Sequence, residues 1–147
     1  MERRAAAAVE SVDALTVEDR LEIHQLISQY SFYEDSGNAE AWAALFTNDG
    51  GFIGSGDKSI FGRENLTEFA RRRWADKPQV RNWTHWVSNI VIRPAAGGAV
   101  SESYQMTLEK QADGYRIVKL SGKSDELRRE DGEWRFHVRR IVPMPNE

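Results

Sequence analysis

The stretch VRNWTHWVSNIVIRPAAGGAVSESYQMTLEKQADGYRIVKLSGKSDELRREDGEWRFHVRRIV, residues 80–142, decides the fold of this 147-residue chain. Hydrophobic and polar residues alternate along much of it, and β-branched and aromatic residues are frequent, which is typical of strands. The pattern predicts four strands, over residues 80–92, 99–109, 115–127 and 133–142. Short turns that contain Gly or Asp separate them, at residues 95–98, 111–114 and 130–132. We therefore expect an antiparallel sheet built from consecutive hairpins.

Upstream of this stretch, hydrophobic residues recur at helical spacing. Thr16, followed three residues later by Asp19, resembles a capping box and predicts a first helix over residues 17–34. A short second helix is expected after residue 38, ending at residues 48–51, and a third over residues 62–74. Between the last two we expect a brief strand at residues 52–53 and a turn at residues 57–58.

Helices followed by antiparallel strands indicate an α+β class, because alternating βαβ units are absent from the pattern. Long hairpin strands that twist strongly can wrap around the first helix and leave a cavity for a ligand. Residues 15–147 are long enough for one domain, and residues 1–14 are expected to form a flexible leader.

Composition excludes several classes of function. Five Trp, six Phe and four Tyr provide core material, whereas the net charge of -3 offers no basic surface for nucleic acid. No stretch is apolar enough to span a membrane. The chain has no Cys, which rules out disulfides and suits a reducing compartment, so the cytoplasm is the expected location.

Several segments, in order along the chain, resemble the SnoaL-like family of the NTF2-like superfamily. They are DRLEI at 19–23, LFTNDG at 45–50, Thr84-His85, Asn89-Ile90 and GEWRF at 132–136. This resemblance implies a cone in which three N-terminal helices pack on a strongly curved, mostly antiparallel sheet around a pocket. The fold hosts dehydratases, isomerases, cyclases and noncatalytic subunits, so it does not by itself settle function.

The resemblance also implies a pair of interacting residues. The relatives include a scytalone dehydratase, and in others, such as a bile-acid dehydratase and a dehydrochlorinase, a strand histidine pairs with an aspartate that ends the first helix. These positions are His85 and Asp35 here. A carboxylate on one ring nitrogen orients the imidazole and stabilises the cation that forms when the other nitrogen accepts a proton. Alternatively, Asp35 lies on a solvated face of the helix and His85 is a buried histidine bonded to Asn89.

Strict alternation along residues 80–92 places Trp83, His85 and Asn89 on one face of the strand. Trp86, Ile90 and Ile92 then lie on the opposite face, where they need cover from another chain or from helices. We therefore expect Trp83 and Asn89 to bind substrate and the outer face to support a homo-oligomer, either a dimer or a trimer.

Tyr30 lies on the apolar face of the first helix and is expected to act as an electrophile or acid, or else as a core tyrosine. The family pattern implies a pocket arginine at Arg139, for which a surface ion pair is the alternative. Ser124 stands where relatives carry an aromatic residue, which predicts a wider pocket. Tyr33 and Trp42 complete the expected substrate-binding set.

These residues together predict a cofactor-independent lyase that acts on a small hydrophobic organic molecule by elimination, with His85 as base, Asp35 as its partner and Tyr30 as acid. The alternatives are an isomerase or polyketide cyclase that uses the same base, and a noncatalytic ligand-binding or assembly subunit. Three histidines without metal-ligand spacing predict no metal site.

Overall fold

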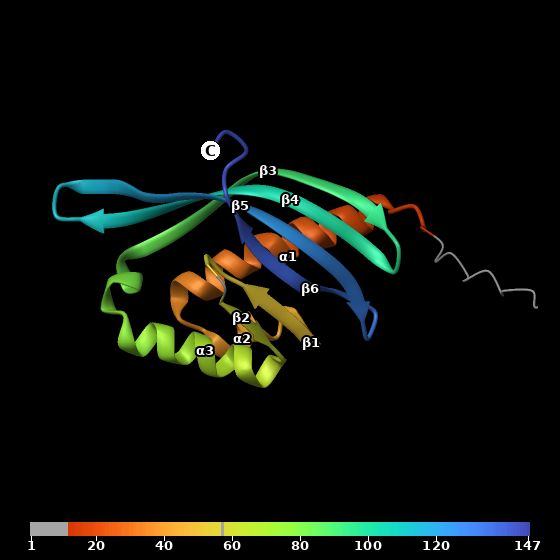
Figure 1. Cartoon of the computed structure of the whole chain (residues 1–147), viewed down its shortest axis with the longest axis horizontal. Coiled ribbons are helices and arrows are strands. Elements are labelled where there is room, and N and C mark those ends of the chain that lie inside the picture. Colours follow the sequence, from red (N-terminus) through yellow and green to blue (C-terminus); the bar gives the residue numbers. More distant parts are fainter. Residues whose placement is uncertain (1–11, 57) are drawn as a thin grey trace, which may run out of the picture.

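The computed structural model describes residues 12–56 and 58–147, and it contains three helices, one short 3₁₀ helix and six strands. Figure 1 shows their arrangement. The helices are α1 (Val17–Ser36), α2 (Ala39–Ala43), α3 (Arg63–Asp76) and the 3₁₀ helix η1 (Pro78–Asn82). The strands are β1 (Phe46–Ile53), β2 (Ser59–Phe61), β3 (Trp83–Ala95), β4 (Gly98–Gln111), β5 (Gly114–Glu130) and β6 (Glu133–Val142).

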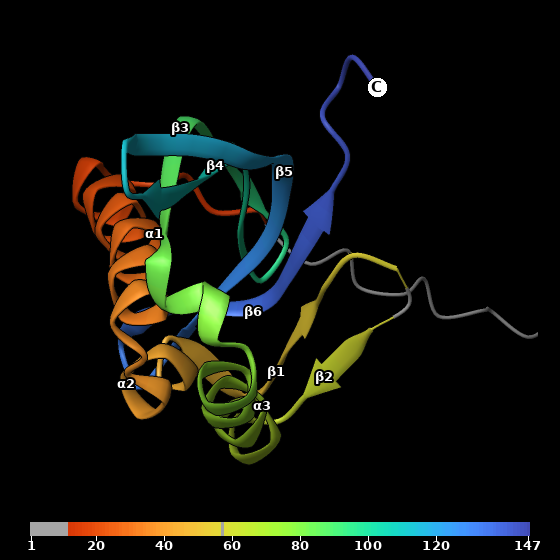
Figure 2. The same ribbon diagram turned by 90° about the vertical axis from the view of Figure 1, so that its left-hand side faces the viewer.

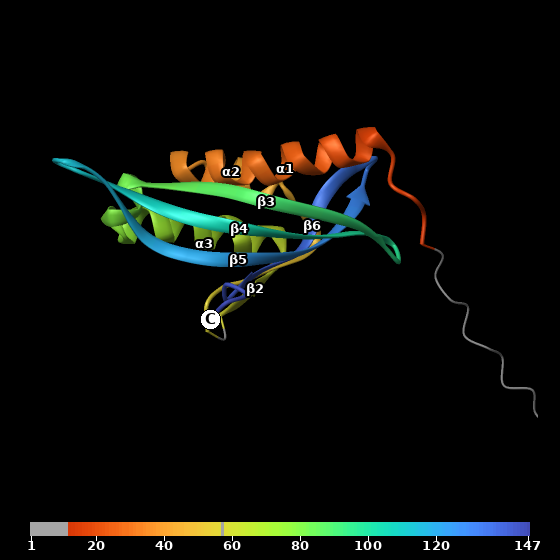
Figure 3. The ribbon, with the colours of Figure 1, turned by 90° about the horizontal axis from the view of Figure 1, so that it is seen from above.

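One six-stranded sheet runs in the order β2-β1-β6-β5-β4-β3. Its neighbours are antiparallel except for β1 and β6, which pair in parallel. Figure 2 shows the sheet curving around the interior, with α1 on one side and α3 below, and Figure 3 shows α1 running alongside β3. The predicted α+β class and the curved, mostly antiparallel sheet are confirmed.

Local sequence explains how α1 begins and ends. The predicted capping box is present, since Thr16 Oγ1 accepts from the Asp19 backbone N–H at 3.1 Å and Asp19 Oδ2 accepts from the Thr16 N–H at 2.9 Å. Gly37 ends the helix in the left-handed conformation at φ 70°, which glycine adopts without strain. These two caps fix the length of the helix, so Glu34 and Asp35 lie in its last turn.

The second helix is shorter than expected, and the prediction that it reaches residues 48–51 is wrong. The chain leaves the helix at Ala44, and Phe46 begins strand β1. Pairing with β6 overrides the local turn signal, because Phe46 aligns with Phe136 and the Phe136 N–H bonds to the Leu45 carbonyl at 2.9 Å. The glycines of β1 permit close packing, since a Cβ on Gly51 would lie 2.3 Å from the Phe61 ring.

Other boundaries also differ from expectation. Residues 80–82 belong to η1 rather than to a strand, since Pro78 begins a 3₁₀ turn and β3 begins only at Trp83. Strand β2 was not predicted, because three residues are too few to show an alternating pattern. It is defined by its pairing with β1 at the edge of the sheet. Most of the predicted leader, residues 1–11, and Asp57 of the predicted turn lie outside the described residues.

A bulge in β3 changes which side chains face the interior. The register between β3 and β4 shifts between Ser88 and Val91, and Asn89 adopts φ 56°. Because of this extra residue, Asn89 is exposed while Ile92 is buried. The prediction that Asn89 shares the face of His85 is therefore wrong, as is the grouping of Ile90 and Ile92 with the exposed Trp86 on the outer face.

Aromatic side chains of the helices and of β1 and β6 form the core beneath the cavity. Phe136 is fully buried and contacts Tyr30 edge-on at 5.7 Å between ring centroids and Phe46 at 5.6 Å. No helix among the described residues is long and apolar enough to cross a membrane.

The position of Phe136 predicts a large loss of stability when its ring is removed. Phe136→Ala should lower the free energy of unfolding by about 3–5 kcal/mol, because it leaves a cavity between Tyr30 and Phe46. Urea unfolding measures this loss. Phe32→Ala is the matched control, since Phe32 is 75% exposed and its truncation should change stability by less than about 1 kcal/mol. Equal losses in both variants would contradict the core described above.

Candidate functional site

A cavity of about 250 Å³ opens between the last turn of α1, the helix α3 and the inner face of β3–β5. Its walls carry two kinds of side chain. Aromatic rings come mainly from the helices, whereas the sheet contributes mostly polar groups such as Gln105, Thr107 and Lys123. The aromatic lining residues are Tyr30, Tyr33, Trp42, Phe52, Phe69, Trp74 and Trp83. Such a site suits a small molecule with an apolar body and a few polar atoms.

His85 and Asp35 are in direct contact. The His85 ring Nδ1 lies 2.6 Å from Asp35 Oδ1, and the His85 backbone N–H donates to Asp35 Oδ2 at 3.0 Å. Both carboxylate oxygens are therefore used to hold one residue of β3 against the end of α1. This arrangement favours the tautomer with the proton on Nδ1, which leaves Nε2 free to accept a proton.

Asp35 is absent from the cavity lining, whereas His85 is part of it. Tyr30 and Asp35 point in different directions around α1, as their five-residue separation requires. Tyr30 and Asp35 need not both line the cavity, because Asp35 contacts His85, which does line it. Asp35 thus acts on the cavity only through the imidazole.

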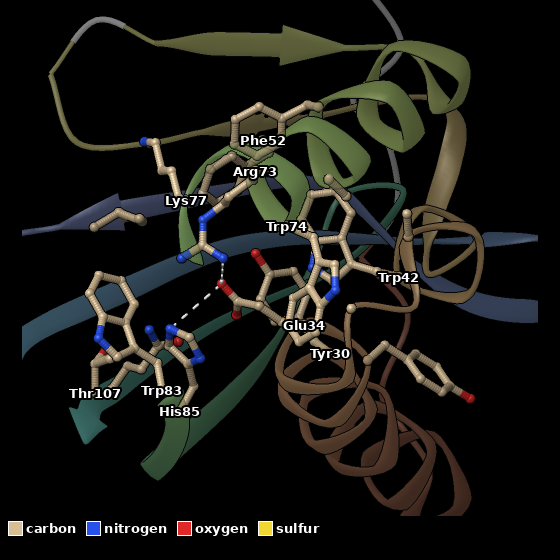
Figure 4. A pocket seen from close by; sticks show the side chains of 18 of the residues that line it. Tyr30, Glu34, Trp42, Phe52, Arg73, Trp74, Lys77, Trp83, His85 and Thr107 are labelled. Carbon is tan, nitrogen blue, oxygen red and sulfur yellow. Dashed lines mark ion pairs between the residues drawn. The ribbon is translucent and has the colours of Figure 1, made fainter. Parts of the chain in front are cut away.

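Glu34 is a cavity residue that the sequence analysis missed. Its Oε1 lies 3.6 Å from His85 Nε2 and 3.6 Å from Arg73 Nη1, as the dashed lines in Figure 4 show. Its other oxygen, Oε2, is buried without a hydrogen-bond partner among the described residues. His85 therefore lies between two carboxylates, with Asp35 on Nδ1 and Glu34 facing Nε2.

Tyr30 and Arg139 form a stack below the cavity. Tyr30 lines the cavity, and burial together with the Glu34 charge raises the pKa of its hydroxyl, so Tyr30 stays protonated and available as a donor. Arg139 is fully buried, with its guanidinium 4.1 Å from the centre of the Tyr30 ring and its Nε 3.4 Å from Asp125 Oδ1. It is inward-facing but lies behind Tyr30 rather than in the cavity lining, and its neighbour Arg140 is exposed.

The remaining predicted residues divide into two groups. Tyr33, Trp42 and Trp83 line the cavity, and Trp83 Nε1 also donates to Glu109 at 2.8 Å. Asn89 and Ser124 do not line it. Ser124 alternates with the buried Lys123 and Asp125 along β5, so its side chain lies on the outer side of the sheet.

The family model for the SnoaL-like domain matches residues 15–140. The chain belongs to the SnoaL-like family. This family includes polyketide cyclases and dehydratases, and membership alone does not fix the reaction of this SnoaL-like protein. None of the curated proteins is similar enough in sequence to match it.

Solved structures with the same fold come from several bacteria. Rv3472 from Mycobacterium tuberculosis, of unknown function, is 28% identical, with 84% of this chain and 70% of that chain covered and a TM-score of 0.73. An NTF2-like protein with a cystatin-like fold from Novosphingobium aromaticivorans is 21% identical, with 89% and 85% covered and a TM-score of 0.79. A protein from Catenulispora acidiphila, solved in complex with S-DNPA, is 21% identical, with 86% and 94% covered and a TM-score of 0.74.

Two lining residues of the SnoaL-like domain, Glu34 and Lys123, have recognisable signals in the sequence. Glu34 continues the apolar file of Ile23, Ile27 and Tyr30 at helical spacing, so a carboxylate ends a buried face. On β4, the buried positions Ser101, Ser103, Gln105 and Thr107 are all polar, which indicates that this face meets a cavity rather than a core. Lys123 pairs with Ser103 in the sheet register and shares that face.

Lys123 is 3% exposed, and its Nζ lies 6.0 Å from the centre of the Tyr30 ring and 5.9 Å from that of Phe52. Burial, followed by the charge of Arg139, lowers the pKa of Lys123 to about 7. Its amine is therefore a mixture of charged and neutral forms near neutral pH. Among the described residues, no group of three or more His, Cys, Asp and Glu side chains could hold a metal ion.

The depressed pKa predicts how Lys123 affects stability. In the unfolded chain Lys123 titrates near 10.5 and in the folded protein near 7, so between these pH values the unfolded chain binds more protons. The stability of the wild type relative to Lys123→Met should therefore rise as pH increases from about 7 to 10. Urea unfolding of both proteins across this range measures the difference.

Lys110→Met is the matched control for this measurement, because Lys110 is an exposed lysine on β4. Its stability difference from the wild type should not change with pH over the same range. A pH-independent difference for Lys123→Met as well would show that the amine is not desolvated in the folded protein.

Proposed function

We propose that this protein is a cofactor-independent lyase that removes a proton from a small organic molecule and expels a neighbouring leaving group. The 2.6 Å contact between His85 Nδ1 and Asp35 Oδ1, with His85 facing the cavity, carries this proposal. Dehydration is the reaction we place first, because hydroxide is a poor leaving group that benefits from a nearby proton donor.

In the proposed reaction His85 Nε2 takes a proton from a carbon next to a carbonyl group. The electron pair of the C–H bond forms the new C=C bond, the C–O bond to the hydroxyl breaks, and the imidazolium returns its proton to give water. Asp35 stabilises the imidazolium through Nδ1. The protonated Tyr30 hydroxyl donates to the carbonyl oxygen as negative charge develops there.

Arg139 takes part only through Tyr30. Its guanidinium lies 4.1 Å from the centre of the Tyr30 ring and 4.5 Å from that of Phe136, and this packing fixes the orientation of the phenol. In this proposal Arg139 is a positioning residue, in place of the substrate contact expected from the sequence.

The same base supports an isomerase or a polyketide cyclase. In these reactions the carbanion is reprotonated at another carbon or attacks within the molecule, and no leaving group departs. The charged pair of Glu34 and Arg73 beside His85 is compatible with each outcome, so the identity of the product separates them. A noncatalytic binding role would retain the cavity without any proton transfer.

The outer face of the sheet supports the proposal of a homo-oligomer. Trp86, Ile117 and Leu120 are 61%, 54% and 50% exposed on β3 and β5. Apolar side chains gathered on one sheet are typical of a face that another subunit covers. The cytoplasmic location and the absence of a cofactor stay predictions from the sequence.

Substitutions at the histidine pair test the proposed chemistry. The probe is the β-hydroxy ketone formed from benzaldehyde and acetone, whose dehydration gives a conjugated enone with strong ultraviolet absorbance. His85→Gln and Asp35→Asn should each lower the rate of dehydration by about 10²–10⁴-fold, because they remove the base or its counter-charge.

His24→Gln is the matched control, since His24 is an exposed histidine on α1. Its rate should equal that of the wild type. The lyase proposal fails if His85→Gln retains the wild-type rate. It also fails if the wild type accelerates neither the dehydration nor the exchange of the proton next to the carbonyl group above the rate in buffer alone, and a binding role then replaces it.

A further inference from the structure

Basic side chains are concentrated in the cavity of a protein whose net charge is negative. Five basic residues line it, and the net charge of the whole chain is -3. Glu34 is the one carboxylate among the described lining residues, and Arg73 already pairs with it. The other four basic lining residues are Lys58, Lys77, Lys119 and Lys123, of which Lys123 is partly neutral near neutral pH.

These lysines contrast with the arginines on the rest of the surface. Arg63, Arg71 and Arg93, for example, each form an ion pair with a glutamate. Among residues 12–56 and 58–147, Lys77, Lys119 and Lys123 form no ion pair with any carboxylate. Lys119 has only a neutral partner, the Ser55 hydroxyl at 2.9 Å. Glu34 is the one carboxylate that these lysines share the cavity with among the described lining residues, and such an excess of cations in a cleft raises the local concentration of anions.

Two of the lysines lie along one strand from the mouth to the interior. Lys119 is exposed and Lys123 is buried, and both face the cavity from β5. Their sheet partners on β4, Thr107 and Ser103, are buried on the same face. Four residues of extended chain separate the two Cα atoms by roughly 13 Å, so the two amines reach the cavity at different depths.

We propose that the molecule bound in this cavity is an organic anion of the aryl or planar carboxylate class, whose apolar body lies against the aromatic helix side and whose negative group is held by the lysines of the rim and of β5. This inference rests on the proposed function in taking the reactive molecule as the occupant of the cavity. It adds a negative group to the small hydrophobic organic substrate expected from the sequence.

The lysines also have a competing explanation, which is that they stabilise negative charge that forms only during the reaction. Lys58, Lys77 and Lys119 are exposed at the mouth, whereas His85 is buried, so the rim lysines are poorly placed for that role. A molecule that cannot react separates the two explanations, because it reports binding of a permanent charge alone.

The test measures the affinities of three unreactive probes of similar shape by calorimetry. Hydrocinnamate carries a carboxylate, hydrocinnamamide is neutral and phenylpropylammonium is a cation. We expect the full-length protein to bind hydrocinnamate at least about tenfold more tightly than the amide, and the cation most weakly. Raising NaCl to about 0.5 M should shrink the preference, since the rim charges are exposed to screening.

Variants of the exposed rim lysines keep the test independent of folding. The double variant Lys77→Gln with Lys119→Gln should lose most of the preference for hydrocinnamate and keep its affinity for the amide within about twofold. Lys110→Gln is the matched control, because it removes one charge from exposed β4 outside the cavity and should retain the preference. Inorganic phosphate should compete weakly, since it cannot contact the aromatic walls.

The inference is overturned if the protein binds the acid and the amide with equal affinity, or if it does not bind hydrocinnamate at millimolar concentration. Competition by phosphate as strong as by the acid would also overturn it. His85→Gln separates it from the proposed function. If that variant keeps the preference for hydrocinnamate and also keeps the wild-type dehydration rate, the chemistry fails and the anion site stands. If turnover needs His85 but no preference is found, the anion site fails alone.

Discussion

The bidentate contact between Asp35 and His85 is the constraint on which the cavity depends. One carboxylate accepts from both the backbone N–H and the ring of His85, so the end of α1 and the start of β3 are joined at a single point. This contact has a consequence for chemistry as well as for position, because it selects the ring tautomer. The carboxyl-terminal end of a helix disfavours an anion, and the two hydrogen bonds from His85 offset that cost at Asp35.

The layout around this point could be predicted from local patterns. The capping box at Thr16, the apolar file of α1 and the hairpin turns after β3 are signals carried by neighbouring residues, and the structure contains them. Only the last two residues of strand β1 were predicted in this way, because the pairing of β1 with β6 joins segments about 90 residues apart. The bulge at Asn89 was also invisible, since an extra residue appears only when β3 is compared with β4.

The candidate site was predicted only in part, because some of its residues are brought together by long-range packing. The family pattern brought His85 and Asp35 together, whereas Glu34 and Lys123 required the observation that polar residues occupy inward positions. Arg139 illustrates the limit of a face assignment. The family pattern places it inward, but only packing shows that the Tyr30 ring separates it from the cavity.

Buried charge is the unusual feature of the sheet below the cavity, where Lys123, Asp125 and Arg139 are all buried and Asp125 pairs with Arg139 in the sheet register. Burial raises the pKa of Asp125, while Arg139 and the Ser101 hydroxyl act in the opposite direction. Removing one charged member of such a group destabilises the fold strongly, because its partner stays buried without a compensating charge.

The bulge in β3 bends this strand and so contributes to the curvature of the sheet. Deleting Asn89 would leave every inward residue of β3 on its present side, yet it would straighten the strand. The shape of the sheet beside the cavity thus depends in part on one inserted residue that does not line the cavity, so related chains can alter this curvature through a change in length with every lining residue kept.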